Sequence, residues 1–307
     1  MKHLGFLGSI AYDNIFQVDR VPSRGERVMG KRLGKHIGGM AANQAIEAAR
    51  YLKGVELIGK VGGDQEGQSM IRQLEERNVG TQLVIVDKSL ATGQSYMYLV
   101  GDDYFSVVTQ EANQSIFPDE AERAVNGLGN GILMVSLEIP IEAAQSALAQ
   151  ARHLGIETIL VPSPPEICTP ALLAAADMLI LNRREAQKLL AIEAVNLVGI
   201  SRELCNLRTR YRCIVVTMGS EGAVLWDGNE ASIASALPVN PIDTTGAGDA
   251  FAGAFVAAYA LGMPLQKALA LGCIAGGLTV SVLGAQTSDH TMDKVLKMYD
   301  LYYSKGK

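Results

Sequence analysis

The sequence predicts an α/β fold, in which a central, mostly parallel sheet is flanked by helices on both faces. Short apolar runs alternate with helical patterns over most of the chain, and this alternation is typical of parallel strands joined by helices. Hydrophobic residues make up 48% of the chain and charged residues 19%, a composition that excludes intrinsic disorder. With 307 residues, the chain is long enough to form one large domain without metals or disulfides.

Seven short apolar runs are predicted to be the strands of this sheet. In chain order they are Leu4–Gly8, Val55–Val61, Ile132–Leu137, Ile156–Val161, Met178–Leu181, Cys213–Thr217 and Ala223–Trp226. The predicted helices have apolar residues at helical spacing. They are Met40–Lys53, Gln65–Arg77, Ile141–Leu154, Arg184–Leu190, Gly248–Leu261, Leu265–Val282 and Met292–Tyr303. Gly54 and Gly262 each follow one of these helices, as expected of helix stops.

Two segments, Ile15–His36 and Thr92–Thr109, break the alternation because they have period-two patterning and turn residues but no helical pattern. In the second, Gly101-Asp102-Asp103 separates two apolar runs, which predicts a hairpin. We expect a small antiparallel sheet that projects from the body. It occupies approximately residues 14–36 and 92–109 of a single domain spanning 1–307. It is either a structural flap or, as the frequent functional role of such insertions favours, a lid over a ligand.

Charge and cysteine content limit the classes of binding partner and the cellular compartment that we expect for this protein. Lys and Arg number 27 against 32 Asp and Glu, so the net charge is −5 and there is no basic excess to bind nucleic acid or an anionic membrane. The 4 cysteines have no Cys-x-x-Cys spacing and are expected to be reduced. The most apolar stretch, Phe251–Met263, is shorter than the roughly 20 residues of a membrane span. We therefore expect a cytoplasmic protein that acts on a small molecule.

Polar residues follow several of the predicted strands. They are Asp13, Glu138, Ser163 and Asn182, and Thr217 at the end of its strand is followed closely by Gly219. Ligands of an open parallel sheet bind outside the carboxyl ends of its strands. This row therefore predicts a site that takes a small polar substrate together with a phosphate-bearing one.

The most informative segment is Asp243–Asp249, which runs directly into a predicted helix. Gly246, Ala247 and Gly248 have little or no side chain, so their amides can approach a ligand closely. They lie at a helix N-terminus, where free N–H groups and the helix dipole favour an anion. If that anion is a phosphoryl group, Asp249 is placed to take a proton from the accepting hydroxyl. The alternative is a purely structural turn in which Asp249 stabilises the helix.

The sequence lacks two other nucleotide-binding motifs. No Gly-x4-Gly-Lys-Ser/Thr segment occurs, which excludes a P-loop. No Gly-x-Gly-x-x-Gly segment opens a helix after the first predicted strand, which argues against a dinucleotide-dependent oxidoreductase. The glycine loop that ends at Asp249 is therefore the candidate for phosphate binding.

On these motifs the chain resembles the ribokinase (PfkB) family of carbohydrate kinases. The segment Asp243-Thr244-Thr245-Gly246-Ala247-Gly248-Asp249 matches the C-terminal signature of that family, and Gly38-Gly39-Met40-Ala41-Ala42-Asn43-Gln44-Ala45 matches the N-terminal one. Three other segments also match: Gly8–Asp13, Pro22–Glu26 and Gly59–Gly67. The resemblance extends from Gly8 to about Ser288. It implies a ribokinase-like fold and ATP-dependent transfer of the γ-phosphoryl group to a hydroxyl, expected to be primary, of a small sugar.

The resemblance also implies roles for individual residues. Asp249 would be the general base, and the amides of Gly246, Ala247 and Gly248 would form the anion hole. The residues that would bind the sugar are Asp13, Gly38, Gly39, Asn43, Glu138 and Asp249. Those that would bind ATP are Asn182, Thr217, Gly219, Ser220, Gly222, Gly246 and Gly248.

Two metal ions are implied in the same way. Glu185 would act on Mg²⁺, through water. The residues that would hold a monovalent cation, usually K⁺, are Asp243, Thr245, Thr279, Val282, Gly284 and Ser288. Asn182 and Glu185 also have the spacing of a helix capping box, and this structural role can coexist with the binding role.

A homodimer formed through the lid is expected as well. The hairpin carries Tyr96, Tyr98 and Phe105. Such a hairpin would leave apolar surface and sheet edges uncovered, which a second copy of the chain could bury. The resemblance points to dimers built in this way.

The chain departs from ribokinases proper at Ala11, where they have Asn, and at Met40-Ala41, where they have Lys-Gly. Met40 cannot donate a hydrogen bond to a hydroxyl, so the site should reject a substrate that needs this donor and tolerate apolar or base-bearing groups. These departures argue against ribose itself and leave a ketose, a sugar acid or a nucleoside open as the acceptor. The alternative functions are a nucleoside kinase of the same fold and a non-catalytic sugar or nucleotide sensor.

Overall fold

The computed structural model describes residues 3–101, 103–207, 211–282 and 290–303, and the strands of its larger sheet are taken from these ranges. They are β1 (His3–Leu7), β4 (Val55–Gly62), β5 (Val84–Asp87), β8 (Gly131–Ser136), β9 (Glu157–Val161), β10 (Met178–Asn182), β11 (Cys213–Thr217), β12 (Gly222–Trp226) and β13 (Ala231–Ser235). Their order across the sheet is β13-β12-β11-β10-β9-β8-β1-β4-β5. Pairing is parallel from β11 to β5, and β12 and β13 form an antiparallel edge. The predicted α/β fold is confirmed.

Helices cover both faces of this sheet. One face packs against α1 (Met40–Ala49), α2 (Gln65–Glu75), α8 (Ala247–Ala260), α9 (Leu265–Thr279) and α10 (Met292–Tyr302). The other packs against α3 (Pro118–Leu128), α4 (Ile141–His153), α5 (Pro170–Ala175), α6 (Arg183–Leu190) and α7 (Leu197–Asn206). Alternate residues of a strand enter different cores: in β8, Ile132 and Met134 face the first set and Leu133 and Val135 the second. The strands read as continuous apolar runs because both of their faces are buried.

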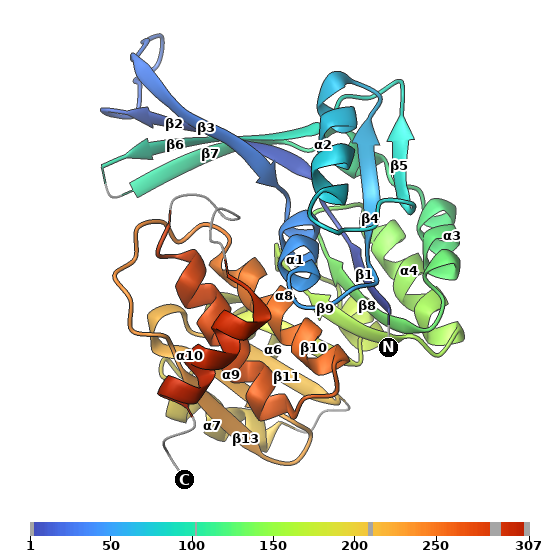
Figure 1. Cartoon of the computed structure of the whole chain (residues 1–307), viewed down its shortest axis with the longest axis vertical. Helices are drawn as coiled ribbons and strands as arrows, with labels where there is room; N and C mark the ends of the chain where they lie inside the picture. Colours follow the sequence, from blue (N-terminus) through green and yellow to red (C-terminus); the bar gives the residue numbers. More distant parts are fainter. Residues whose placement is uncertain (1–2, 102, 208–210, 283–289, 304–307) are drawn as a thin grey trace.

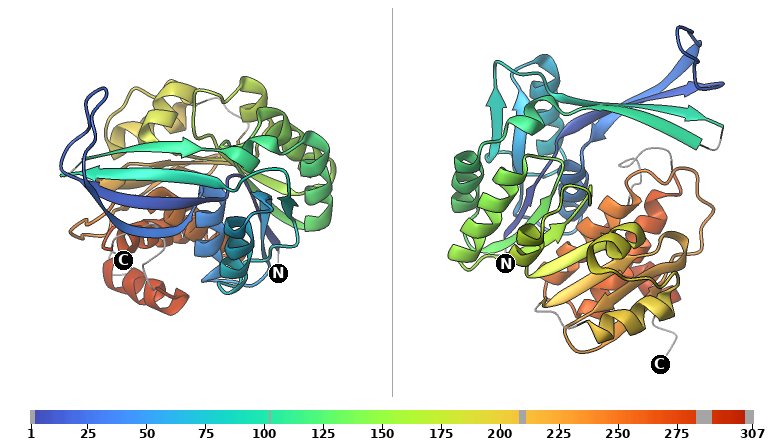
Figure 2. Two further views of the ribbon diagram at one scale, coloured as in Figure 1. Left: turned by 90° about the horizontal axis from the view of Figure 1, so that it is seen from above. Right: turned by 180° about the vertical axis from the view of Figure 1, so that it is seen from behind.

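Four further strands form a separate sheet, the lid. They are β2 (Ala11–Val18), β3 (Gly30–Gly38), β6 (Gly93–Val100) and β7 (Asp103–Thr109), in the order β3-β2-β6-β7. Figure 1 shows the lid projecting from the body above the C-terminal helices, and the view from above in Figure 2 shows its strands lying across the body. The lid therefore roofs the part of the body that carries the Asp243–Asp249 loop.

The antiparallel pairing predicted for the lid holds within its two hairpins, β2–β3 and β6–β7. The pair that joins them, β2–β6, is parallel. Both of these strands leave the body for the lid in the same direction, β2 after β1 and β6 after β5. Two strands that start from the same base must pair in parallel.

The predicted strands and helices all occur, and the structure adds elements that the sequence pattern did not indicate: β5, β13, α3, α5 and α7. Of these, β13 is a short edge strand of mainly small residues, and α5 has only 6 residues, three of them alanine. Alanine and serine give little hydrophobic periodicity, so such elements are difficult to detect.

Two predicted helices end earlier than expected. The helix α9 stops at Thr279, and the carbonyl of Val280 accepts the backbone N–H groups of Ile242 and Asp243. The helix α1 stops at Ala49, where the backbone tightens: Arg50 N–H bonds the carbonyl of Glu47 three residues back. In both cases backbone hydrogen bonds, long-range at α9 and local at α1, accompany an end of the helix that comes before the end of the hydrophobic pattern.

No helix in the described part of the chain combines the length and the apolar character needed to cross a membrane. The four cysteines are free thiols, with Cys213 and Cys273 buried, Cys168 partly buried and Cys205 exposed.

Candidate active site

Asp13 lies in β2 and places a carboxylate on the body-facing side of the lid. Its partner strand approaches closely, since a Cβ atom on Gly38 would lie 2.3 Å from Asp13 Oδ2. Only glycine leaves room for the carboxylate there. Asp13 had been expected at the end of the first strand of the large sheet, and it instead begins the roof above that edge.

Gly39 makes the turn from β3 into α1. Its φ of +87° lies in the region that favours glycine, and a Cβ atom there would lie 2.6 Å from the carbonyl oxygen of Ser9. The Ser9 hydroxyl accepts the N–H of Met40 at 2.9 Å and donates to the Glu138 carboxylate. Ser9 therefore joins the start of α1 to the loop after β8, and its hydrogen bond fixes the orientation of Glu138.

Asp249 lies in the first turn of α8 and is held by α1. Its Oδ2 accepts Asn43 Nδ2 at 3.1 Å and its Oδ1 accepts Gln44 Nε2 at 2.9 Å. The two helices pack closely, because a Cβ atom on Gly253 would lie 2.5 Å from the carbonyl oxygen of Gln44. Two amide donors and a close helix contact give this carboxylate one defined position.

Burial is the main cause of an unusual pKa at Asp249, which it raises to about 7. The hydrogen bonds from Asn43 and Gln44 oppose this shift, and the charges of Glu138 and Asp13 add to it. A carboxyl group with a pKa near neutrality is a better proton acceptor than an ordinary aspartate.

Asp13 shows the same behaviour. Burial raises its pKa to about 6, a hydrogen bond with the Ser95 side chain opposes the shift, and the charges of Glu138 and Asp243 add to it. Carboxylates therefore converge from the lid, the β8 loop and α8 on one small region. Such a region favours neutral groups that donate hydrogen bonds, such as sugar hydroxyls, and disfavours anions.

These shifts predict the pH dependence of turnover. As the predicted general base, Asp249 accepts a proton only when it is ionised, so kcat/KM should rise as pH rises through about 7 and then level off. Below this pKa it should fall roughly tenfold per pH unit, and more steeply below about 6, where Asp13 is also protonated. Initial rates with a saturating phosphoryl donor across this range measure the profile. A flat profile between these two pKa values would contradict it.

The glycine loop begins α8. Gly246 is the N-cap with φ 75° and ψ 1°, a left-handed conformation, and Ala247 is the first helical residue. A Cβ atom on Gly248 would meet no other atom within 4 Å, so the space beside this glycine is open. The loop is fixed behind, where Asp243 Oδ1 accepts the N–H of Thr245 at 2.9 Å. The N–H of Ala247 bonds the Thr244 carbonyl at 3.3 Å, whereas the N–H groups of Gly246 and Gly248 have no backbone partner among the described residues. Unpaired amides at a helix N-terminus suit a phosphoryl group.

The predicted cation residues lie behind this loop only in part. Thr279 ends α9, and Val280 next to it binds the backbone of Asp243. The Thr279 hydroxyl is buried and has no hydrogen-bond partner among the described residues. Val282 is the last residue of a described segment. Gly284 and Ser288 lie outside the described residues.

The residues predicted to bind the nucleotide form a second group, at the ends of β10 and β11. Asn182 pairs with Thr217 across these strands, and Gly219 and Ser220 form the exposed turn that follows. Gly222 has a structural explanation instead, since its φ is +120° and a Cβ atom would lie 2.0 Å from the carbonyl oxygen of Ala234.

Asn182 and Glu185 form the capping box that their spacing indicated. Asn182 Oδ1 accepts the N–H of Glu185 at 2.9 Å, and Glu185 Oε2 accepts the N–H of Asn182 at 2.8 Å. Burial raises the pKa of Glu185, against which its hydrogen bonds with Asn182 and Ser163 act. The capping role is therefore real, and the carboxylate has little capacity left for direct metal coordination.

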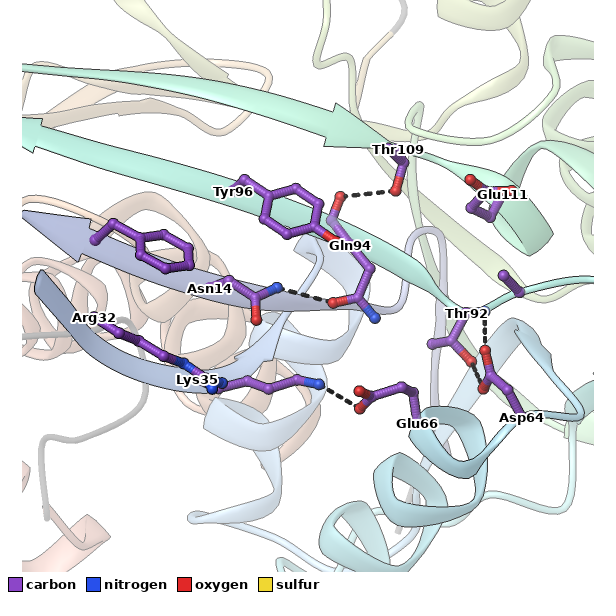
Figure 3. A pocket seen from close by; sticks show the side chains of 12 residues that line it. Asn14, Arg32, Lys35, Asp64, Glu66, Thr92, Gln94, Tyr96, Thr109 and Glu111 are labelled. Carbon is purple, nitrogen blue, oxygen red and sulfur yellow. Dashed lines mark hydrogen bonds and ion pairs between the residues drawn. The ribbon is translucent and has the colours of Figure 1, made fainter. Parts of the chain in front are cut away.

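A pocket of about 510 Å³ lies on the opposite face of the lid, and Figure 3 shows it from close by. It is lined by Asn14, Phe16, Arg32, Lys35, Asp64, Glu66, Ala91, Thr92, Gln94, Tyr96, Thr109 and Glu111. None of the predicted site residues lines it, because residues of opposite parity along a strand point to opposite faces. Asn14 turns away from the side to which its neighbour Asp13 points.

The structure thus brings the predicted residues into two groups. The first, here called the acceptor group, contains Asp13, Gly38, Gly39, Asn43, Glu138 and Asp249. The second follows β10 and β11, further along the same sheet edge. Sequence reasoning missed three supporting residues, Ser9, Gln44 and Ser95. The first two lie inside the matched motifs, but only the folded structure shows what their side chains contact.

A lid over carboxylates, beside a glycine-rich helix N-terminus and a second polar group along the sheet edge, is the arrangement of a small-molecule kinase. Comparison with known proteins agrees. The model of the pfkB family of carbohydrate kinases matches residues 1–292, and the chain belongs to this family.

Individual relatives give the same result. A ribokinase of Staphylococcus aureus is 30% identical over 295 residues, which cover 94% of this chain and 97% of that protein. The structure of Arabidopsis thaliana ribokinase complexed with ribose and ATP is 26% identical and superimposes with a TM-score of 0.87 over 97% of this chain and 98% of that one. A nucleoside kinase of Methanocaldococcus jannaschii, 21% identical with a TM-score of 0.78 and covering 98% of this chain and 99% of that one, shares the fold.

Proposed function

We propose that this carbohydrate kinase transfers the γ-phosphoryl group of ATP to a hydroxyl, expected to be primary, of a small uncharged sugar. The observation that carries the proposal is the position of Asp249. Its carboxylate lies one turn into α8, is oriented by Asn43 and Gln44, and shares its surroundings with Asp13 and Glu138. A base, an anion-binding turn and hydroxyl acceptors are thereby available in one place.

Each group of residues would have one task in the reaction. Asp13 and Glu138 would accept hydrogen bonds from sugar hydroxyls and fix the ring. Asp249 would take the proton of the attacking hydroxyl at a carboxylate oxygen, while the amides of Gly246–Gly248 would stabilise negative charge on the transferred group. ATP supplies the phosphoryl group, and Mg²⁺ would supply the counter-charge for the phosphates. The lid would exclude water, so that transfer goes to the sugar.

Mg²⁺ fits this site as an ion held mainly by the nucleotide. In the described residues no cluster of three or more His, Cys, Asp or Glu side chains could hold a metal. Glu185 already binds Asn182 and Ser163. It would therefore act on the ion through water, as is common for a cation that keeps several of its waters.

K⁺ fits behind the glycine loop. A buried hydroxyl without a hydrogen-bond partner is costly, and Thr279 Oγ1 is such a group among the described residues. A bound monovalent cation would give this oxygen a partner. Asp243 and Thr245 would contribute to the same site, because the backbone of Asp243 is bonded to the carbonyl of Val280, the residue after Thr279.

Replacement of Thr279 by valine tests the cation. Valine keeps the shape and removes the hydroxyl, so in the absence of K⁺ we expect equal or slightly higher thermal stability. K⁺ should raise the melting temperature and the turnover of the wild type, and both increments should shrink severalfold in Thr279→Val. Choline chloride at equal ionic strength is the control salt. If K⁺ raised the melting temperature and the turnover equally in both proteins, Thr279 would not be a ligand of the cation.

The same proposal includes a single kinase domain that forms a homodimer through its lid. In support, Phe16, Tyr98 and Phe105 stack across three lid strands with centroids 5.5 and 4.8 Å apart. They lie on the face that points away from the body, where Val107 is 54% exposed.

The four free thiols and the net charge of −5 support a reducing, cytoplasmic compartment and argue against a nucleic-acid partner.

An acceptor panel tests the proposed function. ADP formation from ATP is measured with Mg²⁺ and K⁺ for ribose, 2-deoxyribose, other pentoses, ketohexoses, sugar acids and nucleosides. We expect turnover with a neutral sugar and little with sugar acids, because carboxylates surround the acceptor group. Turnover with nucleosides alone would favour a nucleoside kinase. Binding of acceptors without any turnover would favour a sensor.

A further inference from the structure

A row of three polar side chains crosses the body-facing side of the lid. His36 in β3, Asp13 in β2 and Ser95 in β6 occupy paired positions, and paired residues of neighbouring strands point to the same side of a sheet. Ser95 hydrogen bonds to the Asp13 carboxylate. His36 therefore faces the acceptor group, although no motif in the sequence indicated it.

Two glycines determine where the side chains in this row lie. Residues 34, 36 and 38 share one face of β3. A Cβ atom on Gly34 would lie 2.5 Å from His36 Nε2, and one on Gly38 would lie 2.3 Å from Asp13 Oδ2. The imidazole thus lies over Gly34, on the side of the lid tip, whereas the carboxylate lies over Gly38, on the side of the body. In the described part of the chain, no hydrogen bond to either His36 nitrogen is found, and the ring is partly buried.

The other end of the row, at Ser95, lies near the glycine turn that is proposed to bind the transferred phosphoryl group. Met97, two residues after Ser95 in β6, receives a contact of 3.8 Å at its sulfur from the Thr245 hydroxyl. Thr245 directly precedes the glycine turn, so β6 lies above the anion hole. His36 lies on β3, two strand spacings or about 10 Å from β6. It therefore faces the end of the acceptor that is remote from the reacting hydroxyl.

Two described positions near the base of the lid have no side-chain donor to offer this remote end. Ala11 pairs with Gly38 at the base of the lid, and Met40 follows the turn at Gly39. Both side chains are apolar. Asp13 and Glu138 supply only acceptors when ionised. A hydroxyl bound here finds acceptors in excess, and the imidazole of His36 is the donor within reach of the same side.

We propose that His36 is a specificity-determining residue that donates a hydrogen bond to a hydroxyl of the neutral sugar at the end remote from the phosphorylated position. This inference rests on the proposed function and deepens it. The imidazole supplies the donor that Ala11 and Met40 lack, and the adjacent Asp13 carboxylate accepts from a neighbouring hydroxyl. Together they select a polyhydroxyl acceptor and reject an analogue in which that hydroxyl is missing.

The kinetic constants of His36 variants test the assignment. For the acceptor with the highest turnover in the panel, His36→Ala should raise KM by about tenfold and change kcat by less than about threefold, because a binding contact away from the reacting atoms is lost. His36→Gln, which retains an N–H donor, should recover part of the loss. Deoxy analogues of that acceptor identify the contact: the analogue that lacks the bound hydroxyl should show the same KM with wild type and His36→Ala.

Gly34→Ala offers a second and independent test. Its methyl group would displace the imidazole without changing it, so KM should rise in the wild-type background. In the His36→Ala background the methyl group meets no ring, and Gly34→Ala should have no further effect. Arg32→Ala is the matched control, because Arg32 lies in the same strand but lines the pocket on the opposite face. It should leave both constants within about twofold of the wild type.

The outcomes separate this inference from the proposed function. Turnover by the wild type with unchanged KM in His36→Ala for every acceptor would overturn the role of His36 alone. Additive effects of Gly34→Ala and His36→Ala would do the same. Absence of turnover by the wild type with every acceptor would overturn the proposed function, and this inference with it.

Discussion

Asp249→Asn should reduce turnover by a factor on the order of 10²–10⁴ while the protein remains folded. The amide cannot accept the proton of the attacking hydroxyl, but it is the same size as the carboxyl group. Its hydrogen bonds with Asn43 and Gln44 can be kept, because the side-chain amide of a partner can rotate to match it. The loss should appear mainly in kcat, since Asp13 and Glu138, the residues proposed to bind the sugar, are unchanged.

The stability of the same variant serves as its control. In the folded protein the pKa of Asp249 is raised from 3.8 to about 7, so ionisation of this group opposes folding. This destabilisation begins as pH rises above 3.8, the pKa of the group in the unfolded chain, and is complete above about 7. At pH values above 7, Asp249→Asn should therefore melt at the same temperature as the wild type or higher. A loss of turnover accompanied by a lower melting temperature would mean that the fold was damaged.

Gly248→Val should reduce kcat/KM by a factor on the order of 10²–10³ without loss of stability. A Cβ atom at this position meets nothing within 4 Å, so valine fits the protein. The helix propensity of valine is better than that of glycine by roughly a few tenths of a kcal/mol, so the backbone gives no reason for a loss of stability. The valine side chain would instead occupy open space beside the turn that is proposed to bind the phosphoryl group. Calorimetry together with initial rates measures both effects.

Gly253→Ala, one and a half turns further along α8, should lower the stability of the protein rather than its kcat/KM. Its methyl group would lie 2.5 Å from the Gln44 carbonyl oxygen, so the packing of α8 on α1 must loosen. We expect a loss of about 1–3 kcal/mol in stability, as for other overpacked contacts. If Gly248→Val lost stability like Gly253→Ala, or retained full turnover, the glycine turn would not be the phosphoryl site.

Much of the fold could be predicted because its signals are local. A strand buried on both faces, such as β8, needs a continuous apolar run, and a helix such as α4 needs apolar residues at helical spacing. The elements that were missed have small or polar residues instead, as in β13, or depend on pairing between distant segments. The parallel contact of β2 with β6 joins residues about eighty positions apart in the chain, and no local pattern encodes it.

The site could be predicted as far as its motifs reach. Gly246–Gly248 and Asp249 combine residue types that serve one chemistry, so their spacing alone indicated a phosphate site beside a base. The partners that orient this chemistry could not be found in the same way. Gln44 and Ser9 act through single side-chain contacts made across the fold. His36 reaches the site only because β3 folds back over the body, with Gly34 making room for its ring.

The most direct test of the central claim is the fate of the γ-phosphoryl group. ATP labelled in that group is incubated with the best acceptor of the panel, and labelled sugar phosphate, labelled inorganic phosphate and ADP are counted for the wild type and for Asp249→Asn. We expect one sugar phosphate for each ADP from the wild type, and almost none from the variant in the same time. Label released mainly as inorganic phosphate, or equal sugar phosphate from both proteins, would contradict Asp249-dependent transfer to a sugar hydroxyl.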